Sequence, residues 1–207
     1  MKNIVKDALI LFLITALAGV LLAVVNEITK EPIAAQQLAA KEEACRAVFA
    51  DQEYSFELLA FGEEATAEET AWEEIYGKNN KIKEVYSVTD TEGNHSGYVI
   101  TVTNNEGYGG DITFSMGITN DRVLNGISIL ETSETVGLGL EAEKVLAPQF
   151  AGKQVEMFTY TKTGKLNDSE VDAISSATIS TNAYVNGVNA GLAYFDVLVE
   201  MGGAENE

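Results

Sequence analysis

The side chains best suited to chemistry lie in one short stretch that is rich in hydroxyl groups. Its residues are Asp172-Ala173-Ile174-Ser175-Ser176-Ala177-Thr178-Ile179-Ser180-Thr181. A Ser or Thr hydroxyl is a nucleophile when a base activates it, and it can also carry a phosphoryl group as an ester. This hydroxyl stretch therefore offers a nucleophilic or ester-forming site. The alternative is a turn that only caps the helix after it.

An apolar helical pattern follows the hydroxyl stretch directly. Apolar side chains recur at spacings of three and four, as on one buried helix face, at Val185, Val188, Leu192, Phe195 and Val199. Ser180, Thr181 and Asn182 are good N-cap types. Thr178 is therefore predicted within a residue or two of the start of a helix over residues 181–201. Such a start attracts phosphate, because its unpaired N–H groups and the helix dipole point at an anion.

Two glycine-rich segments precede the hydroxyl stretch. The first glycine loop is Gly107-Tyr108-Gly109-Gly110, and the second is Glu134-Thr135-Val136-Gly137-Leu138-Gly139. Neither is a phosphate loop by itself, because the second lacks the third glycine of a dinucleotide fingerprint and no Gly-Lys-Ser/Thr occurs. By spacing alone, both segments are ordinary turns.

The composition excludes several classes of protein. The 207 residues are 46% hydrophobic, which allows one sizeable domain and an anchor. The net charge of −19 argues against nucleic-acid binding, because no basic run outweighs that field. Cys45 and His95 are each the only residue of their type, which excludes an internal disulfide and disfavours a metal site. His95 is predicted at the surface. A hydrolase using Ser175 or Ser176 is a weaker alternative, because no base stands beside them.

Residues 8–25 are almost wholly apolar and uncharged, which predicts a membrane-spanning helix. A cleaved signal peptide is the alternative, since Ala16-Leu17-Ala18 could mimic a cleavage site. The anchor is favoured because the apolar run continues to Val25. Lys2 and Lys6 precede the span, and this weak charge asymmetry favours a cytoplasmic amino terminus.

Residues 31–80 are predicted to form a helical linker region that packs on the domain. Pro32 can start or kink a helix. One apolar stripe follows it at Leu38, Cys45, Val48 and Phe49, on which Cys45 is expected to be a small core residue. The acidic residues 63–74 around Trp72 indicate a solvated helix or loop.

The pattern changes to that of β-strands in the second half of the chain. Residues 97–103 are rich in Val, Ile and Thr and follow turn residues at 89–94, which predicts a hairpin. Residues 112–118 alternate apolar with small or polar side chains, which predicts a strand with one buried face. Residues 123–130 are expected to return as the next strand, and residues 155–160 to add another. An antiparallel meander is the simplest topology.

The order of the three motifs resembles a known family. The pattern Asp-x-x-Ser-x-Ala-Thr-x-Ser-Thr is similar to the flavinylation motif of the G subunit of the Rnf electron-transport complex, and the C subunit of the sodium-pumping NADH:quinone reductase has a similar one. In that family both glycine loops precede the motif, in the order seen here. Ser176 stands where the family has Gly, and Val136 replaces a Pro of the second glycine loop. If the turn needs a positive φ at residue 176, Ser is unfavourable there.

The resemblance implies that Thr178 carries FMN through a phosphoester bond. It also implies that glycines 137 and 139 let a flat ring approach the backbone, and that Asp172 helps the flavin transferase to recognise the segment or to hold its metal. The cofactor-binding residues expected from the resemblance are Thr178, Ser175, Ser176, Ala177, Ser180, Asp172, Glu134, Thr135, Gly137, Leu138, Gly139 and Tyr108.

The expected fold class is α+β: a transmembrane anchor over residues 1–30, the linker over residues 31–80, and an FMN-binding domain over residues 81–207 with a mainly antiparallel sheet and flanking helices. The resemblance implies a single-pass flavoprotein subunit of an ion-translocating ferredoxin:NAD oxidoreductase in the cell membrane. Its expected partners are the other membrane subunits and a flavin transferase, and its main domain is expected outside the cytoplasm. The alternatives are the C subunit of the quinone reductase, or a membrane-tethered binding module without redox chemistry.

Overall fold

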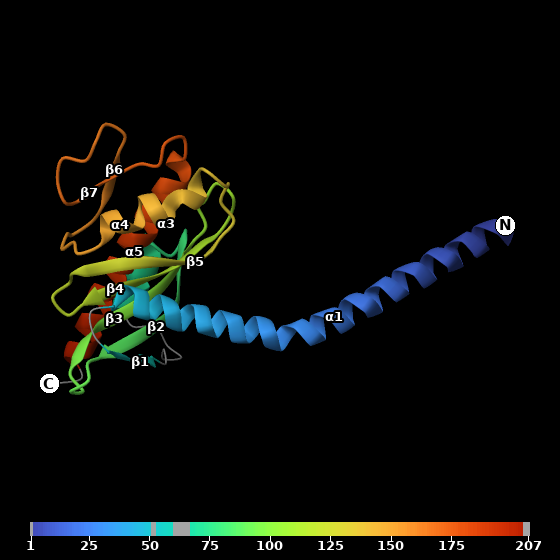
Figure 1. Ribbon diagram of the computed structural model, residues 1–207, viewed down its shortest axis with the longest axis horizontal. Coiled ribbons are helices and arrows are strands. Elements are labelled where there is room, and N and C mark those ends of the chain that lie inside the picture. Colours follow the sequence, from blue (N-terminus) through green and yellow to red (C-terminus); the bar gives the residue numbers. More distant parts are fainter. Residues whose placement is uncertain (1, 51–52, 60–66, 205–207) are drawn as a thin grey trace. The chain divides into compact units, whose positions relative to one another are not determined.

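The computed structural model describes residues 2–50, 53–59 and 67–204 (Figure 1). By its internal packing the chain divides into two units, Met1–Lys41 and Glu42–Glu207. The first helix, α1 (Lys2–Val48), continues from one unit into the other. The described residues between 42 and 80, which fall within the range expected as a linker, therefore belong to the same unit as the sheet.

The first unit contains α1 up to Lys41, and the earlier part of this helix is apolar. Every large hydrophobic side chain from Ile4 to Ile28 is exposed, and an 18-residue window has a mean hydropathy of 3.0. Length and composition make α1 the one helix in the described residues that could cross a membrane. The predicted span at residues 8–25 lies inside it, and Pro32 lies within the same helix.

The second unit is built on a five-stranded antiparallel sheet. Its strands are β1 (Ser55–Leu58), β2 (Asn80–Thr89), β3 (His95–Asn104), β4 (Ile112–Thr119) and β5 (Leu124–Thr132), and they pair in chain order. This order confirms the predicted meander. The α+β fold class is confirmed as well, with β1 as a further edge strand that the sequence pattern did not indicate.

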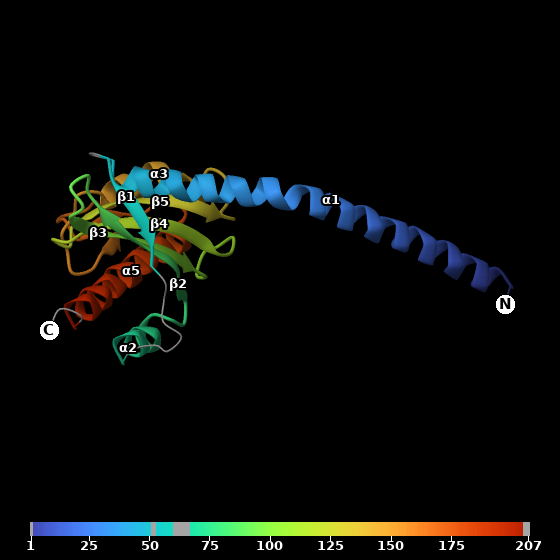
Figure 2. The same cartoon turned by 90° about the horizontal axis from the view of Figure 1, so that it is seen from below.

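The long helix α5 (Thr178–Ala204) packs along one face of the sheet (Figure 2). Its approach is close because small residues face the strands. A Cβ placed at Gly187 would lie 2.9 Å from the Phe114 ring, and a Cβ at Gly191 would collide with Met116. The main core therefore forms between α5 and strands β2 to β5.

The end of α1 covers the opposite face of the sheet. Cys45, Val48 and Phe49 pack there against Val88 and Val99. As a result β4 is buried on both faces rather than one, contrary to the sequence prediction, and Gly117 lies against the Val48 backbone. The predicted apolar stripe reaches the domain only from Cys45 onward, because Leu38 is exposed.

Helix α2 (Ala67–Ile75) fastens β2 to α5 from a region that was expected to be a solvated helix or loop. Its Trp72 side chain is buried, and the indole Nε1–H donates a hydrogen bond of 2.9 Å to the Ala190 carbonyl of α5. Glu69, one turn before Trp72, accepts a hydrogen bond from the Tyr194 hydroxyl of α5, whereas Glu73 and Glu74 are exposed. The helix α2 is therefore amphipathic, with Trp72 and Glu69 on the side that meets α5.

Short elements connect β5 with α5. They are the 3₁₀ turn η1 (Gly139–Glu141), α3 (Ala142–Val145), α4 (Ala147–Phe150), β6 (Thr159–Thr161) and β7 (Glu170–Asp172). The strand expected at residues 155–160 is found as the shorter β6, and it pairs in parallel with β7 in a separate sheet rather than joining the meander. Asn189 on α5 holds the residue before β6, because its amide accepts from the Phe158 N–H at 2.7 Å and donates to the Phe158 carbonyl at 2.9 Å.

Candidate functional site

Helix α5 begins at Thr178, as the hydroxyl stretch predicted to within a residue or two. The Thr181 N–H makes the first intrahelical bond, to the Ala177 carbonyl at 2.9 Å. Ser180, Thr181 and Asn182 therefore lie inside the helix and are not its N-cap. The Thr181 hydroxyl instead ties the preceding turn to the helix, because it donates to the Ala177 carbonyl and accepts from the Ile174 N–H at 3.1 Å.

The first turn of α5 leaves hydrogen-bond donors free. Among the described residues no acceptor pairs with the backbone N–H groups of Thr178, Ile179 or Ser180. A helix start of this kind attracts an anion. Thr178 is half-buried, whereas Ser175 and Ser176 are exposed in the turn before it. An ester-linked phosphate on the Thr178 hydroxyl would stand beside these donors.

The turn before Thr178 has a left-handed residue. Ser176 adopts φ +63°, a conformation that costs residues with a side chain and that glycine adopts freely. Residue 176 is the position at which the family pattern carries Gly. The structure thus gives a physical reason for that Gly: the turn needs a positive φ at this point.

Glu134 links the three motifs. Its side chain is only 6% exposed. One carboxylate oxygen, Oε2, accepts a 2.7 Å hydrogen bond from the Ser180 hydroxyl in the first turn of α5, and Oε1 accepts from the Gly109 N–H at 3.3 Å. The two glycine loops and the hydroxyl stretch, which are far apart in the sequence, therefore meet around this one carboxylate.

The glycines of the two loops have different roles around Glu134. A Cβ at Gly107 would lie 2.8 Å from Glu134 Oε1, and a Cβ at Gly139 would lie 2.6 Å from the Ser180 hydroxyl oxygen. These two glycines make room for the protein's own contacts. Only Gly137, with φ +76° and no atom within 4 Å of its ideal Cβ, leaves open space where a flat ring could approach. Ring contact at glycine 137 or 139 stays a prediction.

The other expected site residues occupy varied environments. Tyr108 is 70% exposed, Leu138 packs at the edge of the core, and the Thr135 carbonyl closes a turn by accepting from the Leu138 N–H at 3.1 Å. Ala177 is buried directly before the helix. The Asp172 carboxylate accepts from the Lys165 N–H at 2.8 Å, so it orders the loop before β7.

A second acidic side chain, which the sequence pattern did not single out, fastens the first glycine loop. Glu106 Oε2 accepts from the amides of Asn186 at 2.7 Å and Asn104 at 3.3 Å, and Oε1 accepts from Asn79 at 2.9 Å. The sequence signal that could have indicated Glu106 is its position directly before the first glycine loop. Nearby on α5, the Tyr184 ring is fully buried, and burial raises the pKa of its hydroxyl to about 12.

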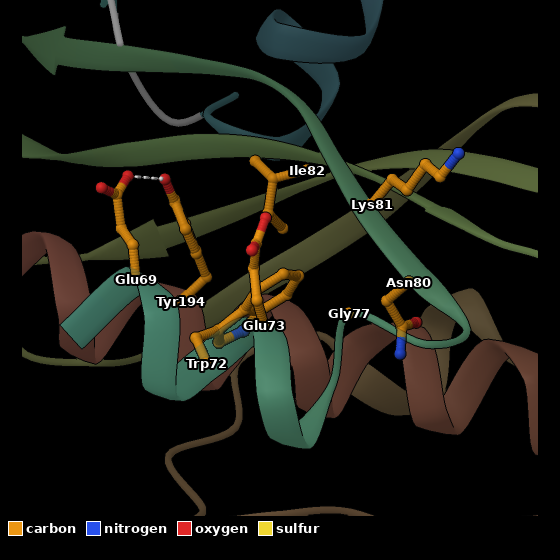
Figure 3. Close-up of a pocket in the computed structure, with 8 residues that line it drawn as sticks. All are labelled: Glu69, Trp72, Glu73, Gly77, Asn80, Lys81, Ile82 and Tyr194. Carbon is orange, nitrogen blue, oxygen red and sulfur yellow. Dashed lines mark hydrogen bonds between the residues drawn. The ribbon is translucent and has the colours of Figure 1, made fainter. Parts of the chain in front are cut away.

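The cavity between α2, β2 and α5 is separate from the motifs (Figure 3). It has a volume of about 490 Å³, and its lining includes Trp72, Glu69, Glu73 and Tyr194 but no residue of the three motifs. Figure 3 shows the Tyr194 hydroxyl bonded to Glu69, at 3.0 Å, with Lys81 extending away from them. Carboxylates at this cavity would repel a phosphate, whereas the start of α5 offers hydrogen-bond donors. The residues at the start of α5 fit a flavin phosphate better.

Comparison with known proteins agrees with these motifs. Residues 107–193 match the family described as the FMN-binding domain, and residues 1–48 match the RnfG N-terminal region. The crystal structure of Shewanella oneidensis NqrC aligns with a TM-score of 0.46 and 18% identity, over 72% of this chain and 82% of that chain.

Two relatives match over nearly their whole length. The G subunit of the ion-translocating oxidoreductase complex of Methanosarcina acetivorans is 28% identical, over 93% of this chain and 95% of that protein. The G subunit of the Na(+)-translocating ferredoxin:NAD(+) oxidoreductase complex of Acetobacterium woodii is 32% identical, over 95% of this chain and 94% of that protein. On this match the chain belongs to the RnfG family, the G subunits of Rnf-type ion-translocating oxidoreductase complexes.

Proposed function

We propose that this protein is a membrane-anchored flavoprotein subunit that relays electrons through FMN attached covalently to Thr178. The observation that carries the proposal is the meeting of three motifs at the start of α5, where Glu134 bonds to Ser180 and to the first glycine loop. The FMN-binding family match over residues 107–193 supports the choice of cofactor.

The covalent step needs only the Thr178 hydroxyl from this chain. Its oxygen forms a bond to the flavin phosphorus, and the bond that breaks is the phosphoanhydride of an activated flavin nucleotide. The leaving phosphate group takes the electron pair, and the hydroxyl proton passes to solvent or to a base of the flavin transferase. No oxidant or reductant is required, because phosphoryl transfer leaves all oxidation states unchanged.

The residues around Thr178 hold and orient the product of that step. A phosphodiester keeps one negative charge, which the free N–H groups at the start of α5 stabilise by about 0.3–1 kcal/mol at an exposed position. Gly137 leaves room for a flat ring. When bound, the isoalloxazine supplies the electron transfer itself. Covalent attachment suits a relay at a membrane surface, where a dissociable cofactor would be lost by dilution.

The apolar part of α1 would hold the domain at the membrane, with the amino terminus in the cytoplasm and residues 42–207 on the other side. The two relatives above are named as subunits of ion-translocating oxidoreductase complexes. Other membrane subunits of such a complex are therefore the proposed partners, and a flavin transferase is the partner during maturation.

The test is Thr178→Val, which nearly preserves the shape of the side chain while deleting the hydroxyl. Its matched control is Ser175→Ala, which removes an exposed hydroxyl three residues earlier. After co-expression with a flavin transferase, a denaturing gel should show a flavin-fluorescent band for the parent chain and for Ser175→Ala, and none for Thr178→Val. Covalent flavin on the Val variant would disprove the assignment of the site.

A membrane-tethered binding module without redox chemistry is the competing function. It predicts that the parent chain stays colourless and keeps its unmodified mass in a host that has an active flavin transferase. Intact mass together with visible absorbance on the protein from its native host decides between the two functions.

A further inference from the structure

Glu134 is a buried carboxylate, and no Lys or Arg among the described residues forms an ion pair with it. Removing a carboxylate from water is costly unless hydrogen bonds compensate for the lost hydration. Its two partners are the Ser180 hydroxyl and the Gly109 N–H. An apolar side chain would fill this space at lower cost, so the carboxylate needs a reason beyond packing.

The position of Ser180 supplies that reason. Ser180 and Thr178 both belong to the first turn of α5, where three backbone N–H groups have no partner among the described residues. A helix end without a side-chain cap frays readily. The hydrogen bond from Ser180 to Glu134 anchors this turn to the second glycine loop at a point only two residues from Thr178.

We propose that Glu134 is a positioning residue for the transfer of flavin phosphate to Thr178. By holding Ser180, it keeps the first turn of α5 formed and presents the Thr178 hydroxyl in one place to the transferase. The inference rests on the proposed covalent attachment and adds a residue that does not itself react. The chemical step is unchanged: the Thr178 oxygen gains the bond to phosphorus, and the phosphoanhydride bond breaks.

The Glu134–Ser180 contact allows a conservative replacement that separates geometry from charge. In Glu134→Gln the amide oxygen can still accept from the Gly109 N–H, and the amide nitrogen can donate to the Ser180 oxygen, because a hydroxyl also accepts. Glu134→Leu fills similar space with no hydrogen bond. If Glu134 acts by holding the turn, Gln should restore what Leu removes.

Glu106 provides the matched control. It also fastens the first glycine loop to α5, but through Asn186, eight residues beyond Thr178. Glu106→Leu should therefore destabilise the domain without loosening the first turn of α5. Thermal unfolding followed by the fluorescence of Trp72, the only tryptophan of the chain, ranks the stability of the variants.

The first measurement uses the full chain before any flavin is attached. Hydrogen–deuterium exchange over residues 174–184 should be faster in Glu134→Leu and in Ser180→Ala than in the parent chain. It should be unchanged in Glu134→Gln and in Glu106→Leu. This readout depends on the chain alone, so it tests the positioning role separately from the covalent attachment.

The second measurement is the rate of flavin incorporation by the transferase, followed by intact mass. Loss of a hydrogen bond to a charged group predicts that the incorporation rate of Glu134→Leu falls by about tenfold or more. The rate of Ser180→Ala should fall by a smaller factor. Glu134→Gln should stay within about threefold of the parent rate, and Glu106→Leu should keep that rate.

Several results would overturn the inference. It fails if Glu134→Leu is modified at the parent rate, or if Glu134→Gln is as slow as Glu134→Leu. It also fails if Glu106→Leu, at equal loss of stability, is equally slow. Should Glu134→Leu not fold, Ser180→Ala decides, because alanine is a good helix residue there. A parent chain that takes no flavin overturns the proposed function itself, even where the exchange data show the predicted anchoring.

Discussion

Replacing Ser176 with glycine should stabilise this protein, against the usual effect of a new glycine. Ser176 has φ +63° in an exposed turn. The left-handed conformation costs a residue with a Cβ about 1–2 kcal/mol. Glycine removes that cost but loses about 0.5–1 kcal/mol through the greater freedom of the unfolded chain. The net gain for Ser176→Gly is therefore about 0.5–1 kcal/mol.

The matched control for this variant is Ser175→Gly. Ser175 is the neighbouring exposed serine and is not among the described residues with positive φ. The same chemical change there costs chain entropy and relieves nothing, so it should destabilise by about 0.5–1 kcal/mol. The free energies of unfolding of the two variants should thus differ by about 1–2 kcal/mol. The chain-entropy cost of a new glycine is the same in both variants and cancels from this difference.

Trp72 makes this difference measurable. Its indole is buried and bonded to α5, so its fluorescence reports the docking of that helix. For a chain of this size, 1 kcal/mol corresponds to about 2–4 °C in Tm. Ser176→Gly should melt about 2–8 °C above Ser175→Gly in the same detergent. Ser176→Asn should melt between the parent chain and Ser176→Gly, since Asn tolerates the left-handed region better than Ser. Equal melting temperatures for the two glycine variants would refute the strain argument.

Three other outcomes follow from the structure. Gly139→Val should lower both Tm and flavin incorporation, because a Cβ there would lie 2.6 Å from the Ser180 oxygen and would displace its contact with Glu134. Unchanged values would mean that the second glycine loop is an ordinary turn. Burial, together with Glu84 and Glu42, raises the pKa of the Cys45 thiol to about 11. The neutral thiol therefore stabilises the folded state fully below the unfolded pKa of about 8.5, and this contribution is lost as the pH rises through the folded pKa. The unfolding free energies of the parent chain and of Cys45→Ala should therefore converge between these two pKa values. Protease added to sealed, right-side-out cells should trim residues 42–207, and complete protection would reverse the proposed orientation.

Local sequence periodicity predicted most of the sheet and the last helix. The alternation in β4 and the three-and-four spacing after Thr178 each mark a face that must be buried, and both elements lie close to the predicted residues. Thr178 is the first residue of α5, so the helix begins three residues before residue 181, where its expected range began. Ser180 and Thr181 look like caps by type, but their hydroxyls bond to Glu134 and to the Ala177 carbonyl.

Contacts between distant segments could not be predicted from spacing. Ser115 on β4 was expected on a solvent face but is buried, and on that face Val48 of α1, more than sixty positions earlier in the chain, lies against Gly117. Trp72 stands within an acidic run, and only the fold shows that α2 docks on α5, through the bond from Trp72 to Ala190 and the bond from Tyr194 to Glu69. Likewise, the motif pattern placed Glu134 at the site, but only the fold pairs it with Ser180, 46 residues away.

The pairing of Glu134 with Ser180 raises an electrostatic question, because the proposed site would place a second anion, the phosphodiester on Thr178, at the same helix start. Helix geometry separates the two charges. Residues two positions apart lie about 200° apart around the axis, so when Ser180 faces the buried Glu134, Thr178 faces nearly the opposite way. Their exposure agrees, since Ser180 is buried and Thr178 is half-buried. The free N–H groups of the first turn form the positive end of the helix dipole, which favours a negative charge close to it on either side. The Glu134 carboxylate on the buried side and a phosphodiester on the exposed side can therefore share one helix start. The carboxylate holds the turn in place, and the phosphodiester needs that turn to be formed.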